Sequence, residues 1–529
     1  MRASRWAPLL VGLAIVLTTV SPSVSASTPD APAPDDRALD LDLDAATIPE
    51  LQRRMADGEL SSVQLTAAYL RRIHRVDHDT HAVLAVSPHA IRDAAASDRR
   101  RRSGAARGAL DGIPVLLKDS VDTASMPTTA GSRALRHRAP AEDAVLVRRL
   151  RAAGAVLLGK ANLSEWANFR STRSTSGWSA VGGQTNNPHV LDRNPCGSSS
   201  GSAVGVAATL TQLAIGTETN GSIVCPAGAN GVVGHKPSLG LVSRTGVVPI
   251  SAEQDTAGPI ARHVVDVAIT LSALQGRDPA DGATSAYPDE QPTNYAAALD
   301  PGALRGARIG VWRQSGVDPD VDRVVRESVA TLRGRGATVV EVEPRYQDEI
   351  AENSLPALLS EFRRDIDGYL RARRGGPDSL HELIEFNRRD PVELGKFGQE
   401  LFEQALDAPS TDDPVYQRQR ASATSLARRS IDELVAAHDL DAIASPTNGP
   451  AWKTSYGSGD DFELGSSDSA AVAGYPNVTV PAGFTGPLPL GISFFSTRWS
   501  DAGILGLASA FEEASHARRP PGYLPSSGS

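Results

Sequence analysis

The pattern of apolar and polar positions predicts strands and helices that follow one another along the chain. Residues 142–153 and 319–335 carry apolar side chains at the spacing of a helix that buries one face. Short apolar runs typical of buried strands occupy residues 115–117, 155–158, 307–311, 337–342, 440–444 and 478–481. Strands that alternate with helices favour an α/β fold with a parallel or mixed central sheet.

Two further regions are predicted to be helical. Thr47 and Pro49 mark the start of one short helix, and Ser61 caps a second helix. Residues from about 345 to 435 are polar, charged and helical in pattern, with no strand signal. We expect this region to be laid over or beside the sheet.

The first residues have the pattern of a secretory signal peptide. Arg2 and Arg5 precede an apolar run over residues 7–20, and small residues follow it up to Ala26. The run is shorter than the roughly 18 residues of a membrane span. We expect residues 1–26 to be cleaved and the mature protein to be secreted, extracellular or periplasmic, without a membrane anchor.

The rest of the chain is expected to form one domain. Pro, Ala and Asp dominate residues 27–45, which predicts a disordered leader. Residues 46–525 exceed the roughly 250–300 residues at which single cores usually split. We therefore expect an unusually large single catalytic domain, to which the helical region over about 345–435 belongs.

Composition and charge restrict the partners. The 529 residues are 40% hydrophobic and 22% charged, as in ordinary globular proteins. The net charge of −9 argues against binding nucleic acid or an anionic membrane, because both need a basic surface.

The histidines and cysteines give no sign of a metal site. His74, His78 and His81 are expected on a polar helix face that is exposed to solvent, so no metal is expected. Only two cysteines occur, Cys196 and Cys225, and whether they form a disulfide stays open.

Two loops rich in Gly and Ser carry the candidate chemistry. Residues 197–202 read Gly-Ser-Ser-Ser-Gly-Ser, and residues 216–222 read Gly-Thr-Glu-Thr-Asn-Gly-Ser. Residues 203–215, between them, form a small-residue segment of helical length that ends in an apolar strand. Glycine lets backbone N–H groups turn inward, and a serine there can act as a nucleophile if a base lies within reach.

A lysine is the candidate for that base. The chain takes nearly all its positive charge from arginine and has lysine only at positions 118, 160, 236, 396 and 453. Lys118 ends the apolar run 115–117, where burial would lower its pKa and make the neutral amine a usable base. Arginine cannot lose its proton in this way. On the residues alone, an ion pair between Lys118 and Asp119 is the alternative role.

Six segments together resemble the amidase signature family. They are residues 112–119, 197–202, 216–227, 231–237, 254–259 and 473–476, in the family's order. Within the family, segments that include residues 162–169 and 196–202 resemble the bacterial peptide amidases. The resemblance covers nearly all of the mature chain. It implies an α/β/α sandwich with a large mixed central β-sheet covered by helices on both sides, and it implies no cofactor.

Carried over position by position, the resemblance implies a Ser-Ser-Lys triad. Ser222 would be the nucleophile, Ser198 the bridging serine that follows a cis peptide bond, and Lys118 the terminal base. Ser199 would support this network. The oxyanion hole would consist of the backbone N–H groups of Thr219, Asn220, Gly221 and Ser222.

The implied reaction is amide hydrolysis through an acyl-enzyme. A peptide or other small amide would be the substrate, and the closest resemblance implies removal of the C-terminal amide of peptides as ammonia. We expect a monomer. The residues expected to contact the substrate are Trp166, Asn168, Phe169, Thr447 and Tyr475.

Four alternatives remain open. The chain could be a general aliphatic or aromatic amidase of the same family. Gly197, Ser199 and Gly201 also match the Gly-x-Ser-x-Gly elbow of an α/β-hydrolase esterase with Ser199 as nucleophile. The amide-hydrolysing subunit of a tRNA-dependent amidotransferase is disfavoured by the predicted signal peptide. An inactive peptide-binding relative is disfavoured by the intact Lys118, Ser198 and Ser222.

Overall fold

Eleven strands form one large mixed sheet in the computed structural model, which describes residues 41–373 and 375–526. β2 pairs in parallel with β3 and β6, β9 pairs in parallel with β10 and β11, and the other neighbours are antiparallel. Across the sheet the order is β1 (Val83–Val86), β3 (Val156–Ala161), β2 (Pro114–Lys118), β6 (Leu213–Glu218), β8 (Thr256–Ala261), β7 (Val233–Lys236), β12 (Asn477–Thr485), β13 (Leu488–Phe495), β11 (Ala442–Pro446), β9 (Arg308–Val311) and β10 (Thr338–Glu341). A separate hairpin joins β4 (Trp178–Ser179) to β5 (Gly183–Gln184).

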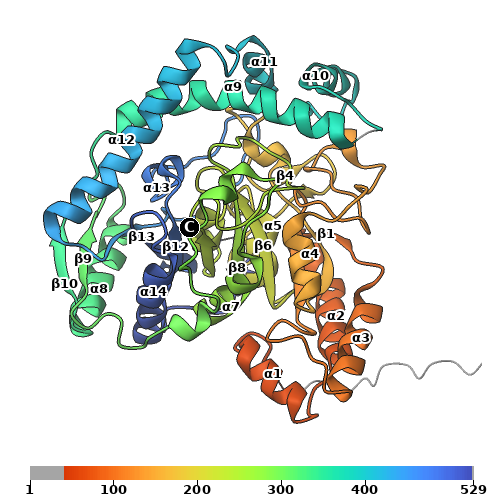
Figure 1. Cartoon of the computed structure of the whole chain (residues 1–529), viewed down its shortest axis with the longest axis vertical. Helices are drawn as coiled ribbons and strands as arrows, with labels where there is room; N and C mark the ends of the chain where they lie inside the picture. Colours follow the sequence, from red (N-terminus) through yellow and green to blue (C-terminus); the bar gives the residue numbers. More distant parts are fainter. Residues whose placement is uncertain (1–40, 374, 527–529) are drawn as a thin grey trace, which may run out of the picture. The chain divides into compact units, whose positions relative to one another are not determined.

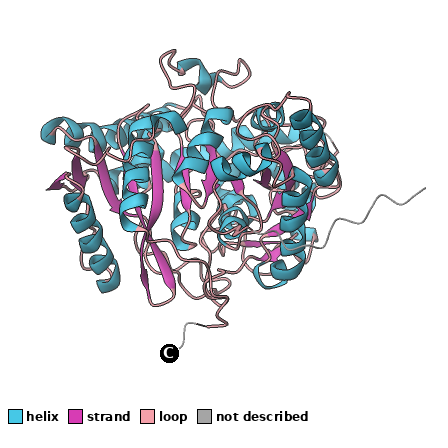
Figure 2. Cartoon of the chain, turned by 90° about the horizontal axis from the view of Figure 1, so that it is seen from below, coloured by secondary structure: helices cyan, strands magenta, loops and turns pink. Residues whose placement is uncertain are grey.

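Helices cover both faces of this sheet (Figure 2). The predicted α/β/α architecture with a large mixed sheet is therefore confirmed. The helices outside residues 345–435 are α1 (Ile48–Ala56), α2 (Ser62–Thr80), α3 (Ala90–Arg102), α4 (Val145–Ala152), α5 (Ser200–Ala207), α6 (Val224–Ala229), α7 (Val264–Leu274), α8 (Pro319–Gly334), α13 (Asp468–Ala473) and α14 (Asp501–Ser515). Short 3₁₀ turns lie at η1 (Arg133–Leu135), η2 (Glu165–Asn168), η3 (Gly282–Ala286) and η4 (Ala296–Ala298).

The central strands are apolar at successive positions because helices bury both of their sides. Every residue of β2, β3, β6 and β8 is buried. Strands with both faces covered read as continuous apolar runs rather than as alternating patterns. This is why the runs at 115–117 and 155–158 could be recognised from the sequence.

Helix α5 lies wholly inside the protein, and its small residues make this possible. All eight of its residues are buried. A Cβ atom at Gly201 would lie 2.3 Å from the backbone oxygen of Ala82 and 2.6 Å from the backbone of Asn162. Glycine is therefore required here for the start of the helix to approach a neighbouring chain segment.

Four helices form the region predicted to be helical. They are α9 (Gln347–Arg373), α10 (Leu380–Arg389), α11 (Glu400–Asp407) and α12 (Pro414–His438). In Figure 1, α9 and α12 run along the top and upper left of the molecule, above the sheet. Apolar side chains of α9, α10 and α11 form a second buried cluster with Trp166 and Phe169, so this region is anchored to the sheet-bearing part of the chain.

A buried charged group also anchors the helical region. Arg170, Glu165 and Glu393 have side chains with 0% exposure. Arg170 Nη1 lies 2.9 Å from Glu165 Oε1 and 3.5 Å from Glu393 Oε2. Removal of one partner from such a group is costly, because it leaves an uncompensated buried charge.

The structure differs from the predicted boundary of the leader. Leu41 and Leu43 pack against the main apolar cluster, and Arg518 Nη1 lies 2.6 Å from Asp44 Oδ2. Residues 41–45 therefore belong to the same compact unit as the rest of the described residues. The predicted signal peptide, residues 1–26, and the rest of the predicted leader lie outside the described residues.

Several elements were not predicted from the sequence. β7 contains His235 and Lys236, and β8 contains Gly258 and Pro259, so neither has the apolar run of a buried strand.

Within residues 41–373 and 375–526, no helix has the length and apolar character needed to cross a membrane.

Candidate active site

The Lys118 amine lies at the end of β2, where it meets a serine hydroxyl. Lys118 Nζ donates hydrogen bonds to Ser198 Oγ (2.7 Å), to Thr217 Oγ1 (2.8 Å) and to the backbone oxygen of Thr217 (3.1 Å). β2 and β6 are parallel neighbours, which brings Thr217 beside Lys118. Lys118 and Ser198 both have 0% exposure. The arrangement presents a buried amine to a hydroxyl at hydrogen-bonding distance.

Burial lowers the pKa of Lys118 to about 7. The cause is desolvation, which disfavours the charged ammonium, while the carboxylates of Asp255 and Glu218 partly oppose the shift. Near neutral pH a large fraction of Lys118 is therefore the free amine. A free amine can accept a proton from Ser198.

Asp119 is paired with a different lysine. Lys160 Nζ lies 2.9 Å from Asp119 Oδ1, and both side chains are 1% exposed. Lys160 also donates to the backbone oxygen of Val121 and to Thr128 Oγ1, each at 2.8 Å. The alternative role for Lys118, an ion pair with Asp119, is thus taken by Lys160.

Ser198 lies in a tightly packed loop. The peptide bond between Gly197 and Ser198 is cis, as the resemblance implies. The backbone oxygen of Ser198 accepts from the N–H of Ser164 at 3.1 Å. A Cβ atom at Gly197 would lie 2.2 Å from Ser164 Oγ, so a larger residue has no space here.

Ser199 connects the loop of Ser198 to that of Ser222. The backbone N–H of Ser199 donates to the backbone oxygen of Ser222 at 3.1 Å. Its hydroxyl donates to the backbone oxygen of Thr217 (3.1 Å) and accepts from the Thr217 N–H (3.2 Å). With 0% exposure and its hydroxyl engaged in this way, Ser199 has the contacts of a supporting residue rather than those of an esterase nucleophile.

The two loops are also joined covalently. Cys196 and Cys225 form a disulfide, which decides the question that the sequence leaves open. Cys196 lies two residues before Ser198, and Cys225 lies three residues after Ser222. The disulfide therefore holds the candidate bridging serine and the candidate nucleophile on adjoining segments.

Ser222 lies at the turn between β6 and α6, which an acidic side chain stabilises. Glu218 Oε2 accepts from the N–H groups of Ile223 (2.8 Å) and Val224 (3.1 Å). Gly221 has a φ of 77°, a conformation that favours glycine. Ser222 itself is 9% exposed, whereas Ser198 and Ser199 are fully buried.

Polar contacts fix the loop that precedes Ser222. Thr219 Oγ1 donates to Asp255 Oδ1 at 2.5 Å, and Gln254 Nε2 donates to the backbone oxygen of Thr219 at 2.8 Å. The side chain of Asn220 donates to Asp468 Oδ1 and accepts from Ser467 Oγ, each at 2.7 Å. The candidate oxyanion segment, Thr219 to Ser222, is thus held on both sides. The supporting role of Asp255 and Asp468 was not predicted. Both residues lie far from residues 219–222 in the sequence, so no local pattern indicates the contacts.

The residues expected to contact the substrate have partners within the protein. Trp166 and Phe169 pack in the second apolar cluster, where their rings contact those of Phe402 and Phe362. The remaining three form hydrogen bonds: Asn168 Nδ2 to Ser176 Oγ (2.8 Å), Thr447 Oγ1 with Thr479 Oγ1 (2.6 Å), and Tyr475 OH to Asp432 Oδ2 (2.9 Å). Substrate contact at these five residues stays a prediction.

A cavity of about 250 Å³ lies beside the candidate oxyanion segment. Asn220 forms part of its wall, residues 347–358 of α9 form another part, and Asp468 and Val472 of α13 complete it.

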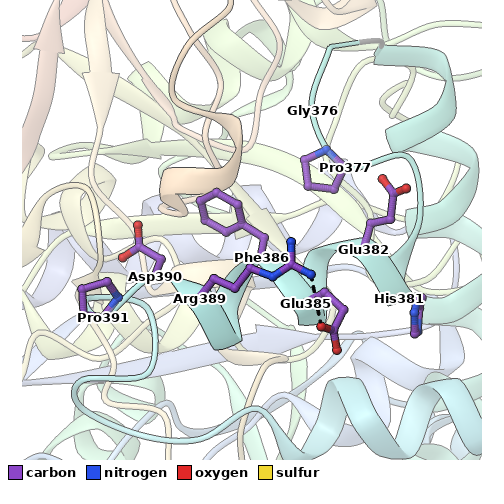
Figure 3. A pocket seen from close by; sticks show the side chains of 9 residues that line it. All are labelled: Gly376, Pro377, His381, Glu382, Glu385, Phe386, Arg389, Asp390 and Pro391. Atoms are coloured by element: carbon purple, nitrogen blue, oxygen red, sulfur yellow. Dashed lines mark ion pairs between the residues drawn. The ribbon is translucent and has the colours of Figure 1, made fainter.

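A second cavity, of about 820 Å³, lies on α10 (Figure 3). Its charged side chains include Arg389 and Glu385, which pair with each other at 3.6 Å, and no candidate site residue lines it. Of these two cavities, the smaller one is lined by a candidate site residue, Asn220.

Comparison with known proteins is consistent with this geometry. The Amidase family model matches residues 64–505. The chain belongs to the amidase signature family. It is an amidase, and it is 39% identical over 493 residues to a probable amidase of Arabidopsis thaliana, with 90% of this chain and 92% of the relative covered.

Solved structures of peptide amidases resemble this amidase. One, in complex with the competitive inhibitor chymostatin, is 50% identical, with a TM-score of 0.88 and coverage of 90% of this chain and 99% of the other. The native peptide amidase from Stenotrophomonas maltophilia is 48% identical, with a TM-score of 0.86 and the same coverage. The amidase is also 35% identical to a glutamyl-tRNA(Gln) amidotransferase subunit from Chloroflexus aggregans over 90% of this chain and 98% of the relative.

Proposed function

We propose that this amidase hydrolyses the C-terminal amide of peptides through an acyl-enzyme on Ser222. The observation that carries the proposal is the contact of 2.7 Å between Lys118 Nζ and Ser198 Oγ, in a site where burial lowers the pKa of Lys118 to about 7. A neutral buried amine next to a serine is the start of a proton relay. The similarity to peptide amidases supports the choice of substrate.

In the acylation step, Ser222 Oγ attacks the carbonyl carbon of the substrate amide. Ser198 accepts the proton of Ser222, and neutral Lys118 accepts the proton of Ser198. The backbone N–H groups of Thr219 to Ser222 stabilise the negative charge that develops on the carbonyl oxygen. The tetrahedral intermediate then collapses, the C–N bond breaks, and the proton returns through Ser198 to the departing ammonia.

Deacylation follows the same relay in the same order. Water attacks the ester carbonyl of the acyl-enzyme, and its proton passes through Ser198 to Lys118. Collapse of the second intermediate breaks the bond to Ser222 Oγ, which recovers its proton from the relay. The products are the peptide with a free carboxyl group and ammonia.

The proposal is tested by mass spectrometry of the products from two substrates. One is a peptide with a C-terminal amide, and the other is a simple aliphatic or aromatic amide. Conversion of the peptide amide to the free acid with ammonia release, and without internal cleavage, is the expected result. Turnover of the simple amide alone would instead assign a general amidase of the same family, with the triad retained.

We also propose that the protein acts as a monomer after export. The disulfide between Cys196 and Cys225 supports export of the protein to an oxidising compartment, because disulfides are rare in the reducing cytosol. N-terminal sequencing of the exported protein should find a start near residue 27. Sedimentation of the mature protein tests the monomer, and association with partner subunits would favour an amidotransferase-like assembly.

A further inference from the structure

The cavity between α9, α13 and Asn220 has an apolar wall and an acidic rim. Ile350 and Val472 are 1% and 3% exposed, and Leu358 is 8% exposed, so the wall is built from fixed core side chains. Leu355, which also lines the cavity, is 43% exposed. Apolar side chains of both α9 and α13 thus line this cavity.

The polar groups of this cavity define its charge preference. Asp468 contributes a carboxylate, one oxygen of which already accepts from Asn220 Nδ2 at 2.7 Å. Gln347 and Ser354 contribute neutral groups, and none of the nine described lining residues is an arginine or a lysine. A negatively charged ligand group would therefore meet a like charge without a compensating cation.

The position of the cavity relates it to the carbonyl carbon that Ser222 would attack. Asn220 lies two residues before Ser222, so their Cα atoms are at most about 7.6 Å apart, two steps of 3.8 Å along the chain. When the leaving group is ammonia, all of the substrate that needs a binding surface lies on the acyl side. The first group on that side is the side chain of the residue that carries the amide.

We propose that this cavity binds the side chain of the amide-bearing residue and selects an apolar, uncharged side chain over a small or acidic one. The inference rests on the proposed function and adds a substrate class to it. The volume of about 250 Å³ is below the range of roughly 300–1,000 Å³ of pockets that enclose a drug-sized ligand, which fits one side chain rather than a whole peptide. The rest of the peptide would lie outside this cavity.

Four substrates that differ in one side chain test the selection. They are acetyl-glycyl dipeptide amides that end in Leu, Ala, Gln or Glu amide, and ammonia release gives kcat/KM for each. We expect Leu amide to exceed Ala amide by at least about 10-fold, because even one methylene in a fitted apolar pocket is worth about 10- to 200-fold. We expect Gln amide to exceed Glu amide by a similar factor, because of Asp468.

Two variants connect these preferences to the cavity. Ala351 is exposed on α9 and lines the cavity, so Ala351→Trp fills the space without disturbing the core. It should lower kcat/KM for Leu amide at least about 10-fold and leave Ala amide within about 2-fold. Ala421→Trp, at an exposed position of α12 that does not line the cavity, is the matched control and should change neither. Asp468→Asn should reduce the preference for Gln amide over Glu amide, a ratio that a general loss of activity does not alter.

The outcomes separate the inference from the function on which it rests. Equal kcat/KM for Leu and Ala amides, or an equal effect of Ala351→Trp on all four substrates, would overturn the inference while amide hydrolysis stands. Release of ammonia from none of the four, together with no labelling of Ser222 by a fluorophosphonate, would overturn the proposed function and the inference with it.

Discussion

The carboxylate of Asp119 lies 2.9 Å from the ammonium group of Lys160, although Lys118 is its immediate neighbour in the sequence. Lys160 belongs to β3, which runs parallel to β2 and places Lys160 opposite Leu117. Two buried lysines thus have different partners: Lys160 has a carboxylate, and Lys118 has the hydroxyl groups of Ser198 and Thr217. Burial lowers the pKa of Lys118 to about 7, which suits Lys118 to the role of base.

Replacement of that base should remove most of the activity. Lys118→Met keeps the length and apolar stem of the side chain but has no group to accept the proton of Ser198. We expect kcat to fall by about 10²- to 10⁴-fold, the usual contribution of general base catalysis. Steady-state kinetics measure this loss, and circular dichroism checks that the variant is folded. A folded Lys118→Met protein with wild-type kcat would contradict the role of Lys118.

The pH dependence should follow the protonation of Lys118. The pKa of this group is lowered to about 7, and the active form is the neutral amine, which predominates above that pH. We therefore expect kcat/KM to rise with pH, to reach half its plateau near pH 7, and to fall about 10-fold per pH unit well below it. A profile of kcat/KM between pH 5 and 9 tests this, and an acid optimum would contradict it.

Two serine variants should separate the nucleophile from the supporting residue. Ser222→Ala should abolish labelling by a fluorophosphonate probe and accumulation of an acyl-enzyme, as intact-protein mass spectrometry would show. Ser199→Ala should still be labelled, but it loses hydrogen bonds with Thr217, and unpaired buried groups cost about 1–3 kcal/mol of unfolding free energy. The reverse pattern, with Ser199 labelled in the Ser222→Ala protein, would support the esterase alternative.

Loss of the disulfide should destabilise the fold around both loops. Cys196 and Cys225 are 29 residues apart, a loop for which chain entropy predicts a stabilisation of about 3–4 kcal/mol. We expect the double variant Cys196→Ala/Cys225→Ala to lower the free energy of unfolding by about that amount in denaturant titrations. Thiol titration of the unfolded wild-type protein provides the control: free thiols should appear only after reduction, and two free thiols without reductant would refute the bond.

The sequence by itself determined the class of the fold and the candidates for the site. The strands 115–117 and 155–158 could be read because helices bury both of their sides, which makes the sequence continuously apolar. The Gly/Ser loops and the few lysines were equally visible, since the chemistry limits which residue types can serve. The helical region over about 345–435 followed from its polar, periodic pattern, and α9 to α12 occupy it.

Only the tertiary structure decided which of these residues meet. The pairing of Asp119 with Lys160 instead of Lys118 depends on the parallel register of β2 and β3, which no local pattern records. The disulfide, the contact of Thr219 with Asp255, and the cavity beside Asn220 likewise join segments far apart in the chain. Local patterns determine secondary structure through short-range sterics and burial, whereas the pKa of a lysine or the shape of a cavity depends on every segment packed around it.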